Sequence, residues 1–259
     1  DGDVIRVKAG VFVEELTIDK AVTIEGPEKD VEGVAAIGDD RDLGEAEITK
    51  PLTVTANGVT IDGMKFSGEG YIVVSGNNFT LTNCIQVCTS YAKAGTSNRY
   101  GQVTNVGTIS GLTITNSYFE CNKNYCYGCI ATSDIVSNVV IKGNFLQSTY
   151  DTGSVNECIQ LYTIDGTIEV SENTIMFDTT NFVIYMGSTG NSCTSVVIKD
   201  NHISGYNGNT AGISVRNMPA ACKFDIVHNY IVGMSGNLID SKTSKAGAQV
   251  NIKYNYFET

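Results

Sequence analysis

The sequence predicts an all-β fold, a single right-handed parallel β-helix (a solenoid) with three strands per coil, because one short phrase recurs along the chain. In each copy an apolar residue is followed three positions later by Asn and, two positions further on, by another apolar residue. Successive copies of this Asn lie 29, 28, 28 and 26 residues apart, so the chain returns to one geometric state in every coil. The copies are VVIKGNFL (139–146), IEVSENTI (168–175), VVIKDNHI (196–203), FDIVHNYI (224–231) and VNIKYNYF (250–257).

The residues around each Asn predict a strand, a sharp bend and a second strand, because they alternate apolar and polar positions and are rich in Val, Ile and Thr. Asn suits the bend, since it tolerates left-handed backbone angles and its amide bonds to neighbouring backbone groups. On stacked coils we expect these amides to form a ladder, each bonded to the next. The expected ladder comprises Asn144, Asn173, Asn201, Asn229 and Asn255, with Ser117, Cys84 and Met64 at the same position of weaker upstream copies.

A second row of short segments, each centred on an Ile that can point into the core, supports the three-strand coil. These segments are GTISG (107–111), GCIAT (128–132), ECIQL (157–161), FVIYM (182–186), AGISV (211–215) and NLIDS (237–241). Strands that recur in register at this period stack as a solenoid, in which each coil contacts only its neighbours.

With this repeat, the chain resembles the pectate-lyase superfamily of right-handed parallel β-helices. The opening residues 1–26, DGDVIRVKAGVFVEELTIDKAVTIEG, resemble the first coils of its secreted bacterial members. The resemblance covers essentially the whole chain and implies the fold. It implies little about function, because this fold carries lyases, hydrolases, esterases, tailspikes, adhesins and inert stalks.

We expect one domain over residues 1–259, because no Gly/Ser/Pro-rich linker divides the chain. Insertions are expected near 27–47, an acidic stretch that we interpret as a protruding solvated loop, and near 89–105. The net charge of −11 makes nucleic acid a poor partner, since phosphate binding needs a clustered positive face. No run of 18 apolar residues occurs, so no membrane span is predicted.

The positions of the eight cysteines predict disulfides between neighbouring coils. Strands of adjacent coils lie about 4.8 Å apart, and a disulfide accepts Cα separations of about 4.4–6.8 Å. The alternatives are buried thiols in a reduced cytosolic protein and a metal site at the C-x₄-C-x₂-C run of residues 121–129, which lacks a nearby His. Disulfides would place the protein outside the cell or on its surface. The candidate pairs are Cys88 with Cys121, Cys129 with Cys158 and Cys193 with Cys222, with Cys84 and Cys126 as a fourth.

From the resemblance we expect catalysis, if any, on the outer face of the Ile-centred row. The residues there are Ser110, Ala131, Gln160, Tyr185, Ser214 and Asp240, which include neither a carboxylate pair nor a Lys or Arg base. The catalytic motifs of the resembling polygalacturonases, pectate lyases and pectin methylesterases are missing. The candidates that remain are Glu172, Asp200 and His228, which directly precede the ladder Asn on successive coils and would lie about 5 Å apart. No cofactor is expected. Calcium is the one alternative, and no Asp-rich cluster in the sequence supports it.

A ligand-binding surface is predicted beside the insertion at 89–105, because Tyr next to Arg or Lys on a loop suits stacking on a sugar or gripping a protein. The candidate binding residues are Tyr91, Lys93, Arg99, Tyr100, Gln160 and Tyr185.

Strand signals reach both ends of the sequence without a helical cap, and open solenoid ends are templates for further strands. Two functions are therefore expected. The first is a non-catalytic extracellular or cell-surface module, structural, adhesive or self-assembling, that partners with copies of itself or with flanking surface domains. The alternative is a carbohydrate-active enzyme, a polysaccharide lyase or glycoside hydrolase, or a glycan-binding protein.

Overall fold

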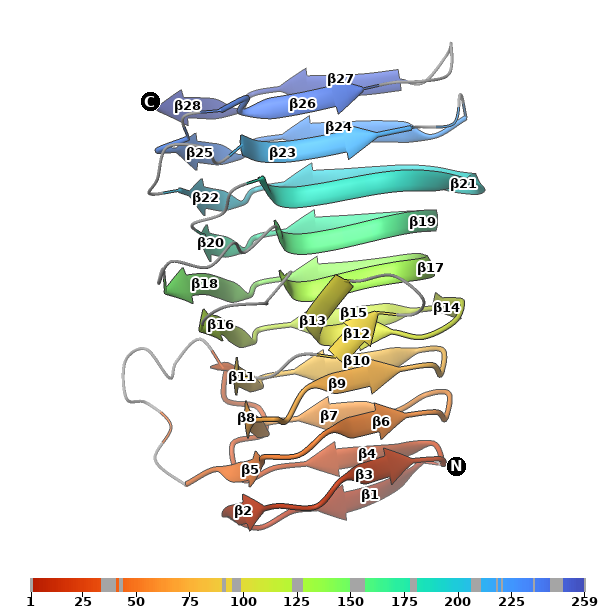
Figure 1. Cartoon of the computed structure of the whole chain (residues 1–259), viewed down its shortest axis with the longest axis vertical. Helices are drawn as coiled ribbons and strands as arrows, with labels where there is room; N and C mark the ends of the chain where they lie inside the picture. Colours follow the sequence, from red (N-terminus) through yellow and green to blue (C-terminus); the bar gives the residue numbers. More distant parts are fainter. Residues whose placement is uncertain are drawn as a thin grey trace.

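The chain folds as a stack of β-coils in a computed structural model of the protein, and Figure 1 shows the N-terminal coil at one end and the C-terminal coil at the other. The structure describes residues 2–33, 41, 44–89, 92–94, 99–122, 128–149, 157–177, 181–205, 211–217, 219, 221–234, 236–242 and 249–258. Its strands join an 18-stranded and a 10-stranded sheet that run the length of the stack, and the pairings between coils are parallel. The prediction of an all-β parallel β-helix with three strands per coil is confirmed.

Each coil contributes one strand to the 10-stranded sheet, which follows the ladder bend. These strands are β2 (Gly10–Phe12), β5 (Ala46–Ile48), β8 (Lys65–Gly68), β11 (Ile85–Cys88), β16 (Tyr118–Asn122), β18 (Phe145–Thr149), β20 (Thr174–Met176), β22 (His202–Ser204), β25 (Tyr230–Val232) and β28 (Tyr256–Glu258).

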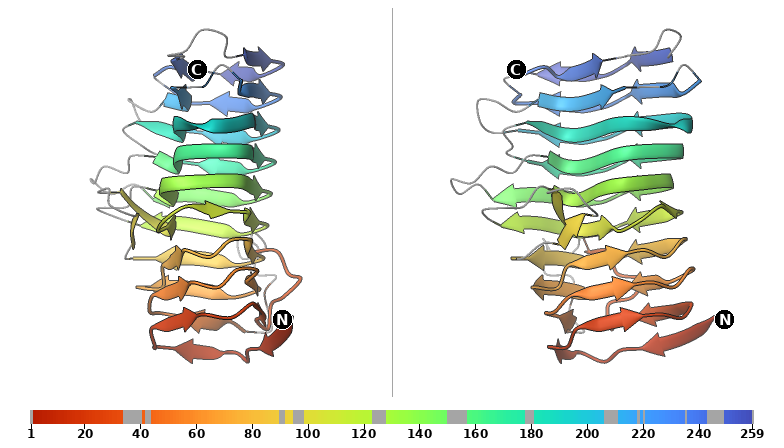
Figure 2. Two further views of the ribbon diagram at one scale, coloured as in Figure 1. Left: turned by 90° about the vertical axis from the view of Figure 1, so that its right-hand side faces the viewer. Right: turned by 45° about the vertical axis from the view of Figure 1, so that its right-hand side comes forward.

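The 18-stranded sheet holds the other two strands of each coil. The strands before the ladder bend are β1 (Asp3–Arg6), β4 (Val22–Glu25), β7 (Thr60–Asp62), β10 (Phe79–Thr82), β15 (Leu112–Thr115), β24 (Lys223–Val227) and β27 (Gln249–Lys253). The Ile-centred row comprises β3 (Leu16–Ile18), β6 (Leu52–Val54), β9 (Ile72–Val74), β13 (Arg99–Asn105), β23 (Ala211–Arg216) and β26 (Ile239–Lys242). In the middle coils the corner between these two rows straightens, and single long strands serve both, namely β17 (Gly128–Lys142), β19 (Glu157–Ser171) and β21 (Phe182–Lys199). Figure 2 shows these long strands from two further sides.

The core is a continuous column of stacked apolar side chains. Residues one coil apart share a register, as in the series Leu81, Ile114 and Ile141, each of which is fully buried. Phe66, Phe119 and Phe224 are also buried in this column. Since alternate residues of a strand point to opposite faces, this stacking puts the intervening residues on the outer faces of the sheets.

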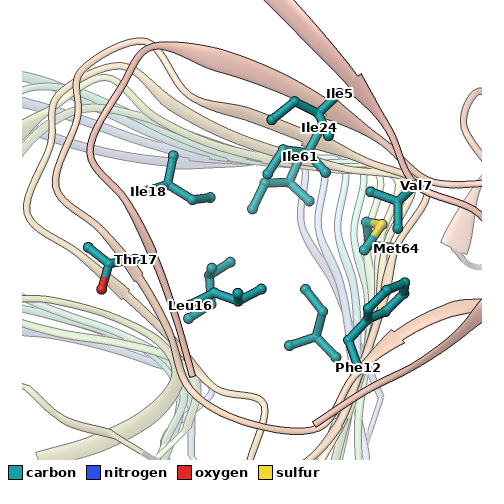
Figure 3. Close-up of a pocket in the computed structure, with 11 residues that line it drawn as sticks. Ile5, Val7, Phe12, Leu16, Thr17, Ile18, Ile24, Ile61 and Met64 are labelled. Carbon is teal, nitrogen blue, oxygen red and sulfur yellow. The ribbon is translucent and has the colours of Figure 1, made fainter. Parts of the chain in front are cut away.

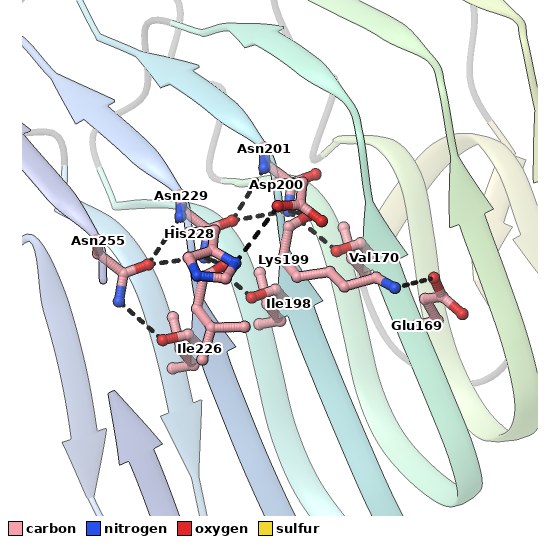
Figure 4. Close-up of polar contacts among 11 residues, drawn as sticks. Glu169, Val170, Ile198, Lys199, Asp200, Asn201, Ile226, His228, Asn229 and Asn255 are labelled. Atoms are coloured by element: carbon pink, nitrogen blue, oxygen red, sulfur yellow. Dashed lines mark hydrogen bonds and ion pairs between the residues drawn. The ribbon is translucent and has the colours of Figure 1, made fainter. Parts of the chain in front are cut away.

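The Asn ladder is present at the bend between the two sheets (Figure 4). Asn173 donates both its backbone N–H (3.1 Å) and its Nδ2 (2.9 Å) to the Oδ1 of Asn201, and Asn201 does the same to Asn229 at 3.1 and 2.9 Å. Each Nδ2 also donates to a strand carbonyl of the preceding coil, such as Val170 for Asn201. The series runs through Asn144, Asn173, Asn201, Asn229 and Asn255, and it begins with the N–H groups of Cys84 and Ser117, which donate to Ser117 Oγ and Asn144 Oδ1.

The left-handed residue of the bend is the one before the ladder Asn, which corrects our assignment of that role to Asn itself. Glu172, Asp200, His228 and Tyr254 have φ between 56° and 58°, and the ladder asparagines are not among the described residues with positive φ. Earlier coils place Gly63, Asn83, Asn116 and Gly143 there, residues that accept this conformation at little cost. The ladder Asn is selected for its amide instead.

Residues 26–33 and Arg41, here called the covering segment, lie against the first bends instead of protruding into solvent as expected (Figure 1, beside β8 and β11). The backbone N–H of Gly33 donates to the carbonyl of Asn116 (2.7 Å), and Glu28 is buried. Arg41 pairs with both carboxylate oxygens of Glu45 and donates to the carbonyls of Val31 (3.1 Å) and Asn83 (2.8 Å). The rest of this insertion, 34–40 and 42–43, lies outside the described residues.

Candidate functional site

The outer face of the Ile-centred row carries a polar and aromatic cluster near the middle of the stack. The strand register aligns Gln160 of β19, Tyr185 of β21, Ser214 of β23 and Asp240 of β26 in one column. Thr104, and not Ser110, is the neighbour of Ala131 in this column, because β13 pairs with the first part of β17 while β14 (Ile109–Ser110) pairs further along, at Val136 and Ser137.

Glu157 is the buried carboxylate of this cluster, with 3% of its surface exposed. It accepts hydrogen bonds from Gln160 Nε2 (2.8 Å) and from Asn181 Nδ2 (2.7 Å). Gln160 is equally buried, and its Oε1 has no hydrogen-bond partner among the described residues. A buried acceptor left without a donor costs free energy, so a donor group of a ligand would be stabilised there.

Arg216 lies over two aromatic rings of the same face. Its guanidinium carbon is 5.0 Å from the ring centre of Phe182 and 5.6 Å from that of Tyr185, within the range of cation–π attraction. Its Nε donates to Ser214 Oγ (3.2 Å), and its Nη2 lies 3.4 Å from Asp240 Oδ2. Tyr162 stacks on Tyr185 at 6.3 Å between ring centres, which widens the aromatic surface.

These residues form a surface suited to binding a polar ligand with flat apolar faces, because aromatic rings, a guanidinium and a buried carboxylate with its amides lie on one sheet face. The sequence indicated Gln160 and Tyr185. It did not indicate Glu157, Asn181, Phe182 or Arg216, although the outward parity of Arg216, two residues after Ser214, was a usable signal.

The predicted binding loop at 89–105 contains a β-hairpin. β12 (Ala92–Ala94) pairs antiparallel with β13, with Lys93 opposite Tyr100 and Ala94 opposite Arg99. Tyr91 lies outside the described residues, as do the side chains of Lys93, Arg99 and Tyr100. Their role in binding stays a prediction.

Glu172, Asp200 and His228 each follow a residue of one register column, Ser171, Lys199 and Val227, and Figure 4 shows Asp200 and His228 next to each other at the ladder bend. His228 Nδ1 is 3.7 Å from Asp200 Oδ1, the His228 ring stacks on Tyr254, and Glu172 pairs with Lys142 at 3.0 Å. All three side chains are exposed: 59% of the surface of His228, 46% of that of Asp200 and 49% of that of Glu172. Beside them, hydrogen bonding from Ser171 and the Lys199 ammonium hold the pKa of Glu169 below its usual 4.5. Exposed groups in water are weak acid–base catalysts, so this column is the poorer candidate site.

Cys193 and Cys222 form a disulfide, with Cα atoms 5.4 Å apart. Their positions are one residue out of register, because Ser195 pairs with Lys223. Of the other two candidate pairs, Cys129 and Cys158 have their sulfurs 4.0 Å apart, and the pairing of Cys88 with Cys121 stays a prediction. In-register neighbours point the same way and keep the spacing of the strands, about 4.8 Å, whereas a disulfide needs Cβ atoms about 3.5–4.5 Å apart.

Cys84 occupies the ladder position of its coil as a buried thiol. Its Sγ donates to the carbonyl of Thr82 at 3.0 Å, and burial raises its pKa to about 12. Cys126 lies outside the described residues. Within the described part of the chain, no group of three His, Cys, Asp or Glu side chains is arranged to hold a metal ion.

The N-terminal end of the stack opens into the core (Figure 3). A hollow of about 290 Å³ is lined almost wholly by apolar side chains of the first coils, among them Ile5, Phe12, Leu16 and Ile24. At the opposite end Tyr254, Tyr256, Phe257 and Ile252 of the last coil are exposed. The first and last described coils therefore both present apolar surface.

No family model matches the chain, and no curated protein matches its sequence. Among the described residues, no helix is long and apolar enough to cross a membrane. The features of the structure that bear on function are the fold, the apolar end coils and the cluster around Glu157.

Proposed function

We propose that the chain is a non-catalytic structural module that assembles end to end with further copies of itself, outside the cell or on its surface, on a fold of the pectate-lyase-like superfamily. The open apolar ends carry this proposal. Exposed apolar patches of this kind mark interaction surfaces, and uncovered parallel strand edges accept a further strand.

A second copy suits these ends, because the two ends are the opposite faces of one repeating coil. The hollow exposes core side chains of the first described coils, and Asn255 of the last described coil accepts from Asn229 with the same ladder geometry as the coils before it. A head-to-tail junction would add strands to both sheets. Such a contact is heterologous and does not close, so it would propagate as a rod.

The test is negative-stain imaging and light scattering of unreduced protein over a concentration series. Wild-type protein is compared with variants in which a substitution disrupts one end of the stack. We expect wild-type protein to form end-joined rods. Phe12→Asp at the N-terminal hollow and Phe257→Asp at the last coil should each remain monomeric, and their equimolar mixture should form dimers. Val106→Asp, at an exposed side position, is the matched control and should still form rods. Monomers of wild-type protein at every concentration, or rods of both end variants, would overturn the proposal.

The extracellular location rests on the Cys193–Cys222 disulfide, since disulfides persist in oxidising compartments.

A different observation favours a second function, a glycan-binding protein or carbohydrate-active enzyme. Gln160 Oε1 has no hydrogen-bond partner among the described residues, and it lies beside buried Glu157 and the aromatic rings under Arg216. A glycan array on the same samples separates the two. Discrete particles that retain a defined polysaccharide would favour the second function.

A further inference from the structure

Three buried cysteines meet where the 10-stranded sheet gives way to the 18-stranded sheet. Cys121 lies near the end of β16, while Cys129 and Cys158 are each the second residue of β17 and β19. The sulfur of Cys129 is 3.5 Å from that of Cys121 and 4.0 Å from that of Cys158, and all three side chains are fully buried. Cys129 is therefore the shared member of two possible pairs.

The two pairs differ in how freely their sulfurs can approach. Cys129 and Cys158 are in register, since Ile130 pairs with Ile159, and the ladder of hydrogen bonds holds them at the strand spacing. Cys121 and Cys129 belong to different sheets and are eight residues apart, so no shared ladder fixes their separation. Their sulfurs, 3.5 Å apart, are closer than those of Cys129 and Cys158, and a side-chain rotation is needed to reach the bonding distance of about 2.05 Å.

We propose that Cys121 and Cys129 form a second disulfide in the mature protein, leaving Cys158 as a thiol beside it. The two thiols lose two protons and two electrons as the S–S bond forms. A small-molecule disulfide such as oxidised glutathione accepts them and is split into two thiols. Because both side chains are buried in the folded chain, the exchange takes place before β16 and β17 have packed.

The bond would join the end of β16 to the start of β17 and close the chain between the two sheets. Cys193–Cys222 ties two neighbouring coils, whereas Cys121–Cys129 would tie two strands within one coil, beside the row that carries Gln160. This inference is independent of the end-to-end assembly, since neither cysteine lies at an end of the stack.

The bond can be mapped in the full chain after refolding in a glutathione redox buffer. The native fraction that carries the Cys193–Cys222 link is alkylated, then digested without reduction by trypsin and chymotrypsin. Trypsin cleaves after Lys123 and chymotrypsin after Tyr125 and Tyr127, which separates Cys121, Cys126 and Cys129. We expect a linked pair of peptides that contain Cys121 and Cys129, lighter by two hydrogen atoms than the separate peptides, and an alkylated Cys158.

Two variants control the assignment. Cys158→Ala should retain the link, and Cys129→Ala should abolish it and leave Cys121 alkylated while Cys193–Cys222 persists. Alkylation of both Cys121 and Cys129 in the wild-type native fraction would overturn the proposal. A link from Cys129 to Cys158 or to Cys126 in that fraction would overturn it as well.

Discussion

The ladder bend is built in two ways along the same stack. From Asn144 to Asn255, here called the ladder half, buried amides inside the bend satisfy the backbone of the preceding coil. In the earlier coils, here called the covered half, Met64, Cys84 and Ser117 hold the same position. Ser117 Oγ still accepts from the N–H of Cys84, and groups from the covering segment add further bonds to the bend. Arg41 donates to the carbonyl of Asn83, and the Gly33 N–H donates to that of Asn116.

The difference shows that neighbouring coils can be joined at the bend by a residue that recurs in every coil or by contacts from one distant segment. An amide in each coil serves any number of coils, because each new coil carries its own donor and acceptor. The covering segment serves only the coils that it reaches. The ladder half is therefore the part of the molecule whose geometry can be continued by a further coil, in keeping with assembly through the last coil.

The largest effect should come from removing one ladder amide. Asn201→Ala leaves the N–H and Nδ2 of Asn173 without their acceptor and takes away the donor to Val170. Since each buried unsatisfied group costs about 1–3 kcal/mol, we expect the free energy of unfolding to fall by roughly 3 kcal/mol or more. Urea unfolding followed by circular dichroism measures it.

Asp200→Asn is the matched control, because it changes the adjacent exposed residue while an Asn still accepts the left-handed conformation. The free energy of unfolding should change by no more than about 0.5 kcal/mol. Equal effects of the two substitutions would contradict a ladder that stabilises this half.

The covered half should depend on Arg41. Arg41→Ala removes the donors to the carbonyls of Val31 and Asn83 and leaves Glu45 without its cation. We expect a loss of about 2–3 kcal/mol in the free energy of unfolding, less than for a fully buried ion pair because Glu45 is 20% exposed. Hydrogen exchange should report loss of protection at the Gly33 amide.

Arg6→Ala serves as the control for Arg41, since Arg6 pairs with Glu25 but is 78% exposed. Exposed pairs contribute about 0–1 kcal/mol, so little change is expected. Unchanged protection at Gly33 in Arg41→Ala would mean that the covering segment is held by other contacts.

The ladder half could be predicted from the sequence because its stabilising residue recurs at a fixed interval. The fold, the register and the ladder from Asn144 to Asn255 all follow from one phrase. The position of the covering segment could not be predicted, because its hydrogen bonds join residues far apart in the sequence, such as Arg41 and Asn83. No sequence pattern indicates such a partner. The residue with positive φ was misplaced by one position, because Glu172, His228 and Tyr254 are types that rarely adopt it.

The candidate site was predicted only in part, for a similar reason. Gln160 and Tyr185 were found through strand parity, which the repeat fixes. Glu157 and Asn181 lie at strand ends, where parity no longer determines the direction of a side chain, and they meet only because β19 and β21 are neighbours. Among the cysteine pairs, Cys193–Cys222 was predicted from the coil spacing, whereas Cys129 and Cys158 stand in register with their sulfurs 4.0 Å apart.

The smallest expected effect concerns the residue before the ladder position, and it should have opposite signs in the two halves. His228 in the ladder half is exposed and has a φ of 56°, a conformation that disfavours side chains other than Gly and Asn. We expect His228→Gly to raise the free energy of unfolding by about 0.5 kcal/mol, because relief of this backbone cost exceeds the entropy that Gly adds to the unfolded chain. Asn83→Gly in the covered half should instead lower it, because Asn83 already tolerates its φ of 53° and its Nδ2 donates to Asp62 at 2.8 Å. Thermal and urea unfolding of both variants measures the two signs. A gain in both would mean that the backbone conformation alone sets the stability of this position, whereas opposite signs require that the covered half draws stability from side chains on the outside of the bend.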